Sequence, residues 1–228
     1  MSIKENIHTL TAAFEAKKIK LIAVSKTKSK EEILEAYNAG QRAFGENIVQ
    51  ELVEKQEQLP QDIEWHLLGH LQTNKVKFIA PFVALIHSVD SLKLLKEINK
   101  QAIKNNRTID CLLQVYIADE DSKFGLDHAE LIELLRDEEF RLLDHVRIRG
   151  LMGIATNTDS QKVIKEEFYE LKMFFDGIKK TYFRKDEHFD VLSMGMSSDY
   201  ELAIEQGSTM VRLGSSIFGK RIIKHFKA

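Results

Sequence analysis

The chain has very few of the residues that cross-link a protein or interrupt its secondary structure. Of its 228 residues, one is cysteine and two are proline. The single cysteine, Cys111, excludes an internal disulfide and a multi-cysteine zinc site. So little proline argues against a proline-rich linker between domains. No apolar run approaches the roughly 18 residues that span a membrane. We therefore expect one domain, residues 1–228, with no membrane-spanning segment.

The chain also lacks an excess of charge of either sign. It has 33 Lys and Arg against 35 Asp and Glu, which gives a formal charge of −2. A charge so close to zero provides no electrostatic reason to expect nucleic acid or an anionic membrane as a partner. The first residues, Met1 to Asn6, are polar and carry no apolar stretch of the kind found in signal peptides. We expect a cytoplasmic protein.

What the chain does have is a regular alternation of short apolar runs, rich in β-branched residues, with longer amphipathic stretches. The expected strands cover residues 19–25, 42–45, 64–68, 83–87, 109–117, 148–152, 189–192 and 210–213. The expected helices cover 2–17, 29–39, 48–58, 74–79, 91–105, 128–137, 160–180, 199–206 and 215–222. Eight strand–helix units favour an α/β protein, a closed (β/α)₈ TIM-type barrel with an extra N-terminal helix. An open doubly wound sheet is the alternative, if two turns have been taken for strands.

Polar and glycine residues gather after the expected strands, which is where barrels of this kind place their sites. Gly214 and Ser215 lie where the last strand meets a helix. There, unpaired backbone N–H groups and the positive end of the helix dipole favour an anion such as a phosphate. Ser197 and Ser198 open the preceding helix and can donate further hydrogen bonds. The alternative is that these residues only cap helices.

Two cations stand at the ends of expected strands. Lys26 follows the first strand, and a partly desolvated lysine there can form a Schiff base with an aldehyde. The simpler alternative is a surface lysine in a loop. Arg212 lies within the last strand, so it must enter a polar site or pair with a carboxylate. In a site, it can donate to a ring nitrogen of a bound cofactor.

Other residues that can carry chemistry are less informative. His66 and His70 are four apart, but Gly69 and the strand before it argue against a chelating helix, so we expect no metal site. Cys111 lies in an apolar run, which favours a core position over a nucleophile.

Several segments together resemble the pyridoxal 5′-phosphate (PLP) homeostasis protein family, PLP-binding barrels related to the N-terminal domain of alanine racemase. They are residues 23–27, 44–47, 65–75, 87–90, 193–199 and 211–219, and the segment from Trp65 to Lys75 is the most specific. One departure is the stretch 150–156, where many members carry prolines after the methionine and this chain, after Met152, has none.

The resemblance implies roles for named residues. Lys26 looks like the lysine that holds PLP as a Schiff base. Ser197, Gly214 and Ser215 look like phosphate ligands. Arg212 looks like the partner of the pyridine nitrogen, and Asn47 is expected to line the pocket near the ring.

The expected function is to carry or buffer PLP in PLP homeostasis, without robust catalytic activity. An arginine at the ring nitrogen stays protonated, so the ring is a weaker electron sink than one paired with an aspartate. Racemisation also needs a second base, which in the racemases comes from an added β-domain, and the chain ends at Ala228 directly after the eighth unit. Its lack of that domain favours a monomer, with PLP-dependent apo-enzymes as recipients.

Two alternatives stay open. One is a PLP-dependent amino-acid racemase or related PLP enzyme that takes its second base from a rim residue such as His70. The other is a cofactor-free Schiff-base aldolase on the same barrel.

Overall fold

The computed structural model describes residues 2–118 and 125–219. Its strands are β1 (Lys20–Val24), β2 (Ala43–Glu46), β3 (Glu64–Leu67), β4 (Leu85–Val89), β5 (Ile109–Gln114), β6 (Val146–Met152), β7 (Val191–Met196) and β8 (Met210–Leu213). Its α-helices are α1 (Ile3–Glu15), α2 (Lys30–Asn38), α3 (Val49–Gln58), α4 (Val76–Ile79), α5 (Leu92–Lys104), α6 (His128–Arg136), α7 (Gln161–Tyr182), α8 (Tyr200–Glu205) and α9 (Ser215–Phe218). Two 3₁₀ turns, η1 (Thr73–Lys75) and η2 (Phe140–Leu142), complete the elements.

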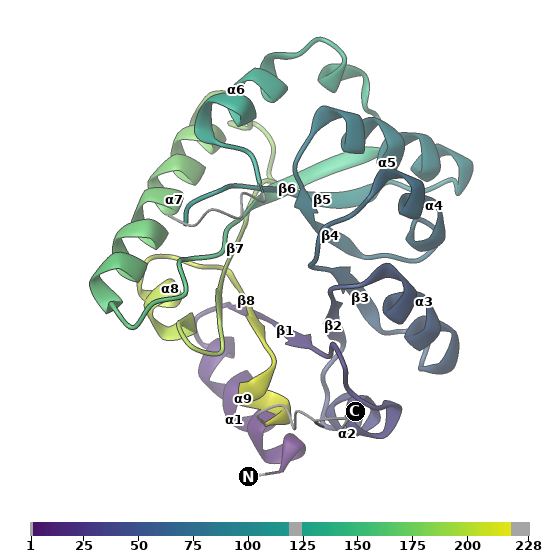
Figure 1. Ribbon diagram of the computed structural model, residues 1–228, viewed down its shortest axis with the longest axis vertical. Coiled ribbons are helices and arrows are strands. Elements are labelled where there is room, and N and C mark those ends of the chain that lie inside the picture. The colour runs from purple at the N-terminus through teal and green to yellow at the C-terminus, as the bar shows by residue number, and fades with distance from the viewer. Residues whose placement is uncertain (1, 119–124, 220–228) are drawn as a thin grey trace, which may run out of the picture.

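The strands form a closed barrel in the order β1 to β8, and every neighbouring pair is parallel. The barrel closes where β8 pairs with β1, with Met210 opposite Lys20 and Arg212 opposite Ile22. Figure 1 looks down this ring of strands, with the helices arranged outside it. The predicted TIM-type barrel is confirmed, and the closed strand order rules out the open doubly wound sheet.

Side chains alternate between the inside of the barrel and the layer of helices around it, as the two-residue period of a strand requires. The interior holds a small apolar cluster made of Ile22, Ala43, Leu85, Leu112, Met152, Val191 and Met210. A much larger core fills the space between strands and helices and includes Cys111, which is fully buried. The predicted core position of Cys111 is confirmed.

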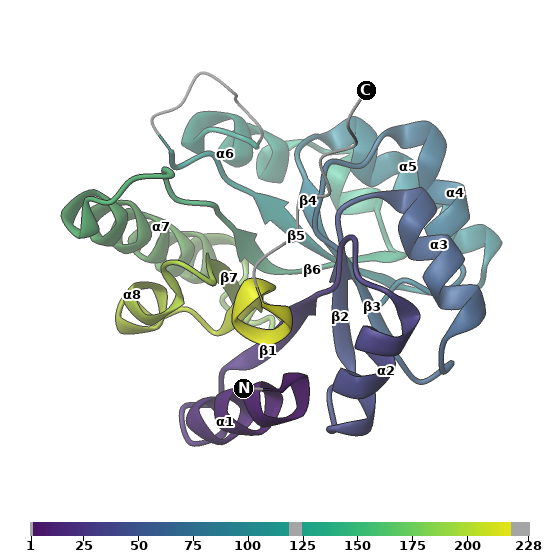
Figure 2. The same ribbon diagram turned by 60° about the horizontal axis from the view of Figure 1, so that its bottom comes forward.

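The expected N-terminal helix is α1. Ser2 and Glu5 form a capping box at its start, which satisfies two of the N–H groups that a helix leaves unpaired. The buried side chains Ile7, Leu10 and Phe14 lie on one face of α1. Asn6 Nδ2 donates to the carbonyl of Ile217, 2.9 Å away, so the first helix contacts the last, and Figures 1 and 2 both show α1 beside α9.

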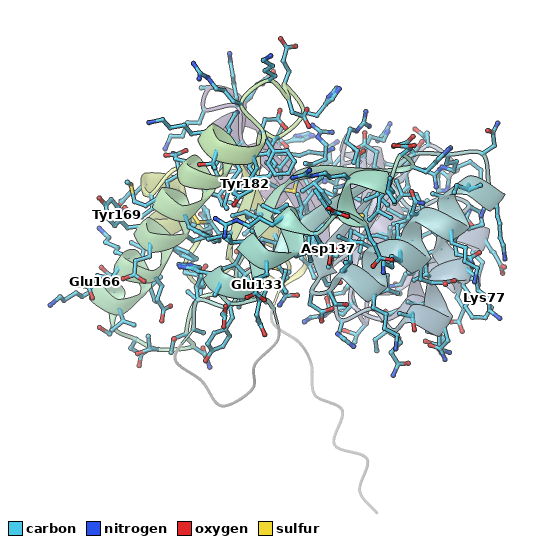
Figure 3. The ribbon with its side chains drawn as sticks, turned by 90° about the horizontal axis from the view of Figure 1, so that it is seen from above. Lys77, Glu133, Asp137, Glu166, Tyr169 and Tyr182 are labelled. Atoms are coloured by element: carbon cyan, nitrogen blue, oxygen red, sulfur yellow. The ribbon has the colours of Figure 1, made fainter. Side chains whose placement is uncertain are left out.

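In the outer layer, α7 lies beside α6, and Arg136 Nε donates to the hydroxyl of Tyr182 over 3.2 Å. Figure 3 shows Glu166 and Tyr169 on the outward side of α7. Within the described ranges, none of the helices combines the length and apolarity that crossing a bilayer requires.

Several boundaries differ from the sequence prediction by a few residues, and two of them bear on the site. β4 runs to Val89 and β7 to Met196, whereas the expected strands end at residues 87 and 192. Each has a register shift against the next strand, and in β7 Gly195 takes a φ of +97° there, so a bulge continues a strand that serine and glycine made look like a turn. α9 ends at Phe218, and residues 220–222 of the expected last helix lie outside the described residues.

Candidate functional site

A cavity of about 430 Å³ opens at the carboxyl ends of β1, β7 and β8. All six residues predicted for the site line it: Lys26, Asn47, Ser197, Arg212, Gly214 and Ser215. They come from four separate parts of the chain, and closure of the barrel brings them together. Apolar side chains, among them Val24, Leu68 and Met196, cover part of its wall. A flat ring with polar substituents suits such a lining.

β1 brings Lys26 to the edge of the cavity. Leu21 and Ala23 pack outward against the helices, while Ile22 belongs to the cluster inside the barrel. Ser25 continues the outward set, because its hydroxyl donates to Glu46 Oε1 over 2.5 Å in the layer between barrel and helices. Lys26 follows in the turn after β1, and it lines the cavity.

Two backbone N–H groups converge at one end of the cavity. The N–H groups of Gly214 and Ser216 both donate to Ser197 Oγ, over 3.1 and 3.3 Å. Paired N–H donors beside a hydroxyl suit the oxygens of a phosphate ester. The helix that follows is only Ser215–Phe218, so its dipole contributes less than the sequence suggested. Ser198 donates to Asp199 Oδ2 instead, 3.1 Å away.

Gly214 has no side chain to fill this end of the cavity. Its φ is −111°, which any residue adopts, and a Cβ there would lie 3.4 Å from Val24 O, an ordinary contact. The protein itself therefore does not require glycine at this position. Because both Gly214 and Val24 line the cavity, a methyl group would occupy space that a ligand needs.

Arg212 is held by neutral polar partners. Its Nη1 donates to Ser193 Oγ over 2.6 Å and its Nη2 to the carbonyl of Gly153 over 3.0 Å. The side chain is buried, and this burial lowers the pKa of Arg212 to about 10, while the charge of Asp199 opposes the shift. Arg212 remains protonated at neutral pH. Within the described residues, no carboxylate pairs directly with Arg212. The alternative prediction of a buried ion pair is therefore wrong for this part of the chain.

A chain of polar side chains leads from Arg212 into the barrel, and sequence reasoning missed it. Ser193 Oγ lies 3.1 Å from His87 Nδ1, and His87 Nε2 lies 2.9 Å from His66 Nδ1. If the Ser193 hydroxyl donates to His87, then His87 donates to His66, and within this chain of side chains the His66 Nε2–H is left without a partner among the described residues. His66, like Arg212, is a polar residue between two outward apolar ones, a pattern that would have found it.

His66 and His70 do not come together. His66 faces the barrel interior, whereas His70 Nδ1 lies 3.4 Å from Asp90 Oδ2 and its side chain is 49% exposed. Among residues 2–118 and 125–219, no group of three or more His, Cys, Asp or Glu side chains is arranged to hold a metal ion.

The cavity fits a phosphorylated aldehyde with an aromatic ring. It offers two lysines, of which Lys28 pairs with Glu32 and Lys26 is the candidate for the aldehyde, N–H groups and a hydroxyl for the phosphate, apolar walls for the ring, and a protonated guanidinium for a ring acceptor.

Comparison with known proteins agrees with the kind of ligand that the groups lining this cavity suit. A family described as "Alanine racemase, N-terminal domain" matches residues 1–221. The Pyridoxal phosphate homeostasis protein of Pasteurella multocida is 41% identical over 208 residues, which are 89% of this chain and 87% of that protein. PipY of Synechococcus elongatus, solved with PLP bound, superposes with a TM-score of 0.85 at 36% identity, covering 96% of this chain and 100% of that one. The same protein solved without PLP gives 0.88 at 38%.

Proposed function

The chain belongs to the alanine racemase N-terminal domain family, among the pyridoxal phosphate homeostasis proteins, and from this premise we propose that it binds PLP through Lys26 and carries or buffers it. The observation that carries the proposal is that Lys26 lines the same cavity as Ser197, on whose hydroxyl two backbone N–H groups converge. The solved relative with PLP bound, which covers nearly the whole chain, supports the choice of cofactor.

Each residue has one task in this proposal. The Nζ of Lys26 is the amine that condenses with the PLP aldehyde, with loss of water, to form a Schiff base. Ser197, Gly214 and Ser215 bind the phosphate, with the backbone N–H groups as the main donors. Asn47 and the apolar wall keep the ring in place.

Arg212 orients the pyridine ring and keeps its own proton. Burial lowers its pKa to about 10, which is still about three units above neutral pH, so the guanidinium donates a hydrogen bond rather than a proton. When bound, PLP supplies an electron sink, and a ring nitrogen without a proton is a weaker one. This supports a carrier over an efficient catalyst.

The racemase alternative needs a second proton donor or acceptor on the far side of the ring. His70, the rim residue considered for it, is not among the residues that line the cavity, and it lies beside Asp90. This supports the carrier proposal.

The test is a titration with PLP, followed by absorbance at the Schiff-base band. We expect the band in the wild type and in Lys30→Ala, since Lys30 is exposed on α2. We expect it to be lost in Lys26→Ala. A band that persists in Lys26→Ala refutes Lys26 as the attachment point, and wild type without a band refutes PLP binding as a Schiff base.

A second measurement separates carrier from catalyst. The PLP-loaded protein is incubated in D₂O with free L- and D-amino acids. We expect little deuterium at Cα. Rapid deuteration that disappears in Lys26→Ala would refute the carrier proposal in favour of a racemase or related enzyme.

The remaining parts of the proposal concern the setting. Residues 1–228 are proposed to form one PLP-binding domain, which the family match over residues 1–221 supports. The protein is proposed to act in the cytoplasm as a monomer that supplies PLP-dependent apo-enzymes. Light scattering tests the monomer, whose mass is 26.3 kDa.

A further inference from the structure

Behind the turn that carries Lys26, a buried lysine on α3 makes hydrogen bonds with all three of its donors. Lys55 Nζ donates to the carbonyl of Ser25 over 2.7 Å, to Glu46 Oε1 over 2.8 Å and to Glu51 Oε1 over 2.7 Å. The Lys55 side chain is 9% exposed and that of Glu46 is fully buried. An ammonium group has three N–H donors, so this one is completely used within the protein.

These contacts fix both sides of Lys26 along the backbone. Ser25, directly before it, is held at its carbonyl by Lys55 and at its hydroxyl by Glu46, 2.5 Å away. Thr27, directly after it, donates its N–H to Glu51 Oε1 over 2.6 Å. With the peptide groups before and after Lys26 both fixed, its Cα–Cβ direction into the cavity is fixed as well.

The turn needs such restraint because its backbone is strained. Thr27 has a φ of +65°, in the left-handed region that β-branched residues rarely adopt. Conformations of this kind cost about 1–3 kcal/mol and persist only where the surroundings impose them. The N–H that Glu51 accepts belongs to this same residue, so the cluster acts on the strained position itself.

Burial of this cluster is in part energetically unfavourable, so a contribution to stability alone does not explain it. Glu46 Oε2 is buried without a hydrogen-bond partner in the described structure, and burial raises the pKa of the Glu46 carboxyl, although Lys55 opposes that shift. Buried ion pairs contribute little net stability compared with apolar residues of similar shape. Since Lys55 and Glu46 lie outside the cavity lining, they act on a ligand only through the turn.

We propose that Lys55, held by Glu46 and Glu51, is a positioning residue that aims Lys26 at the aldehyde of its ligand. The inference rests on the proposed function of Lys26. Removing the ammonium frees the turn and slows Schiff-base formation, but it leaves the phosphate end and the walls of the cavity as they are.

The experiment compares two ligands. PLP reports on Schiff-base formation through the rate at which the absorbance band appears. Pyridoxine 5′-phosphate, an alcohol that cannot condense with a lysine, reports on occupation of the cavity alone. The first variant is Lys55→Met, which keeps an apolar stem of similar length. The second is Glu51→Ala, which removes the acceptor of the Thr27 N–H. Because Glu51 is partly exposed, this second variant keeps the test available if Lys55→Met does not fold. The matched control is Lys20→Met. Lys20 is the first residue of β1, at the end of the strand opposite to the turn that carries Lys26; it pairs with Glu64 and is half exposed.

We expect both Lys55→Met and Glu51→Ala to slow Schiff-base formation by about tenfold to a hundredfold, since small misplacements of a reacting group cost that much. Affinity for pyridoxine 5′-phosphate should stay within about twofold, a change below 0.5 kcal/mol. Lys20→Met should match the wild type with both ligands. Unchanged PLP rates in the folded variants overturn the inference, and so does an equal loss with both ligands, which would make the cluster merely structural. A wild type that binds pyridoxine 5′-phosphate but forms no Schiff base refutes the proposed function instead.

Discussion

Lowering the pH is expected to destabilise the fold through the imidazole of His66. This side chain is 1% exposed, and burial, together with the charge of Lys20, lowers the pKa of His66 to about 3 from its ordinary 6.5. Between these two values the unfolded chain binds a proton that the folded chain excludes. The free energy of unfolding therefore falls as the pH drops below 6.5, and it continues to fall until the pH approaches 3.

The size of the effect follows from the same values. A pH of 5 lies 1.5 units below the pKa of 6.5 that the imidazole has in the unfolded chain, whereas the imidazole of the folded chain is still neutral at this pH. At about 1.36 kcal/mol per unit, His66 alone lowers the free energy of unfolding by about 2 kcal/mol between pH 7 and pH 5. That is a large fraction of the roughly 5–15 kcal/mol that stabilises a domain.

Other groups titrate in this window, so the comparison needs a matched variant. Burial, aided by the charges of His66, Arg212 and Lys20, lowers the pKa of His87 well below 6.5, which adds to the loss of stability on acidification. The raised pKa of Glu46 acts in the opposite direction. His66→Gln removes one titration but keeps an amide that can bond to His87 Nε2. Its stability should therefore fall by about 2 kcal/mol less than that of the wild type between pH 7 and pH 5.

The assay is urea unfolding at a series of pH values, followed by fluorescence. Trp65 is the only tryptophan and is 2% exposed, so its emission reports on loss of the core. Wild type and His66→Gln with parallel stability profiles, within about 0.5 kcal/mol from pH 7 to pH 5, would refute the account of the buried imidazole.

Three further predictions test the packing and the cavity. Gly69→Ala should lower the free energy of unfolding by about 1–3 kcal/mol, since its Cβ would lie 2.2 Å from the carbonyl oxygen of Asn47, and it should weaken PLP binding because Asn47 lines the cavity. The control Gly177→Ala, in open space on α7, should instead raise the free energy of unfolding by up to about 1 kcal/mol in the same urea titration. Gly214→Ala should leave the urea midpoint unchanged but weaken PLP binding about tenfold by spectral titration, and equal affinity would show that the ligand does not approach this backbone. Because burial raises the pKa of the Cys111 thiol, a thiol reagent should label the native protein hardly at all and one thiol per chain in urea; rapid native labelling would contradict the buried position.

The alternation of strands and helices was enough to predict the barrel, because each strand–helix unit has its own apolar pattern. The ends of β4 and β7 were not predictable in the same way. Ser193 and Gly195 have the composition of a turn, and pairing of β7 with both β6 and β8 keeps them in a strand. As a result, Ser193 lies inside the barrel rather than in the loop where sequence reasoning put it.

Some parts of the site could be predicted from the sequence, and others depend on the fold. The resemblance assigned roles to Lys26, Asn47 and Arg212 by position, and the structure brings these residues to one cavity. The contact between His66 and His87 depends on the register of β3 against β4, which no local pattern specifies. Lys55 falls on the buried face of α3, three residues after Leu52, where an apolar side chain is the usual expectation. Glu51 lies one helical turn before it, but Glu46 is brought to it only by the fold.

The most direct test of the central claim is to trap the ligand on the protein. The wild type is incubated with PLP, reduced with borohydride, digested and mapped by mass spectrometry. Two lysines line the cavity, Lys26 and Lys28, so the map distinguishes between near neighbours. We predict the reduced pyridoxyl group on Lys26 alone. Its appearance on Lys28 or elsewhere, with Lys26 unmodified, would contradict the account of this cavity as a site built around Lys26.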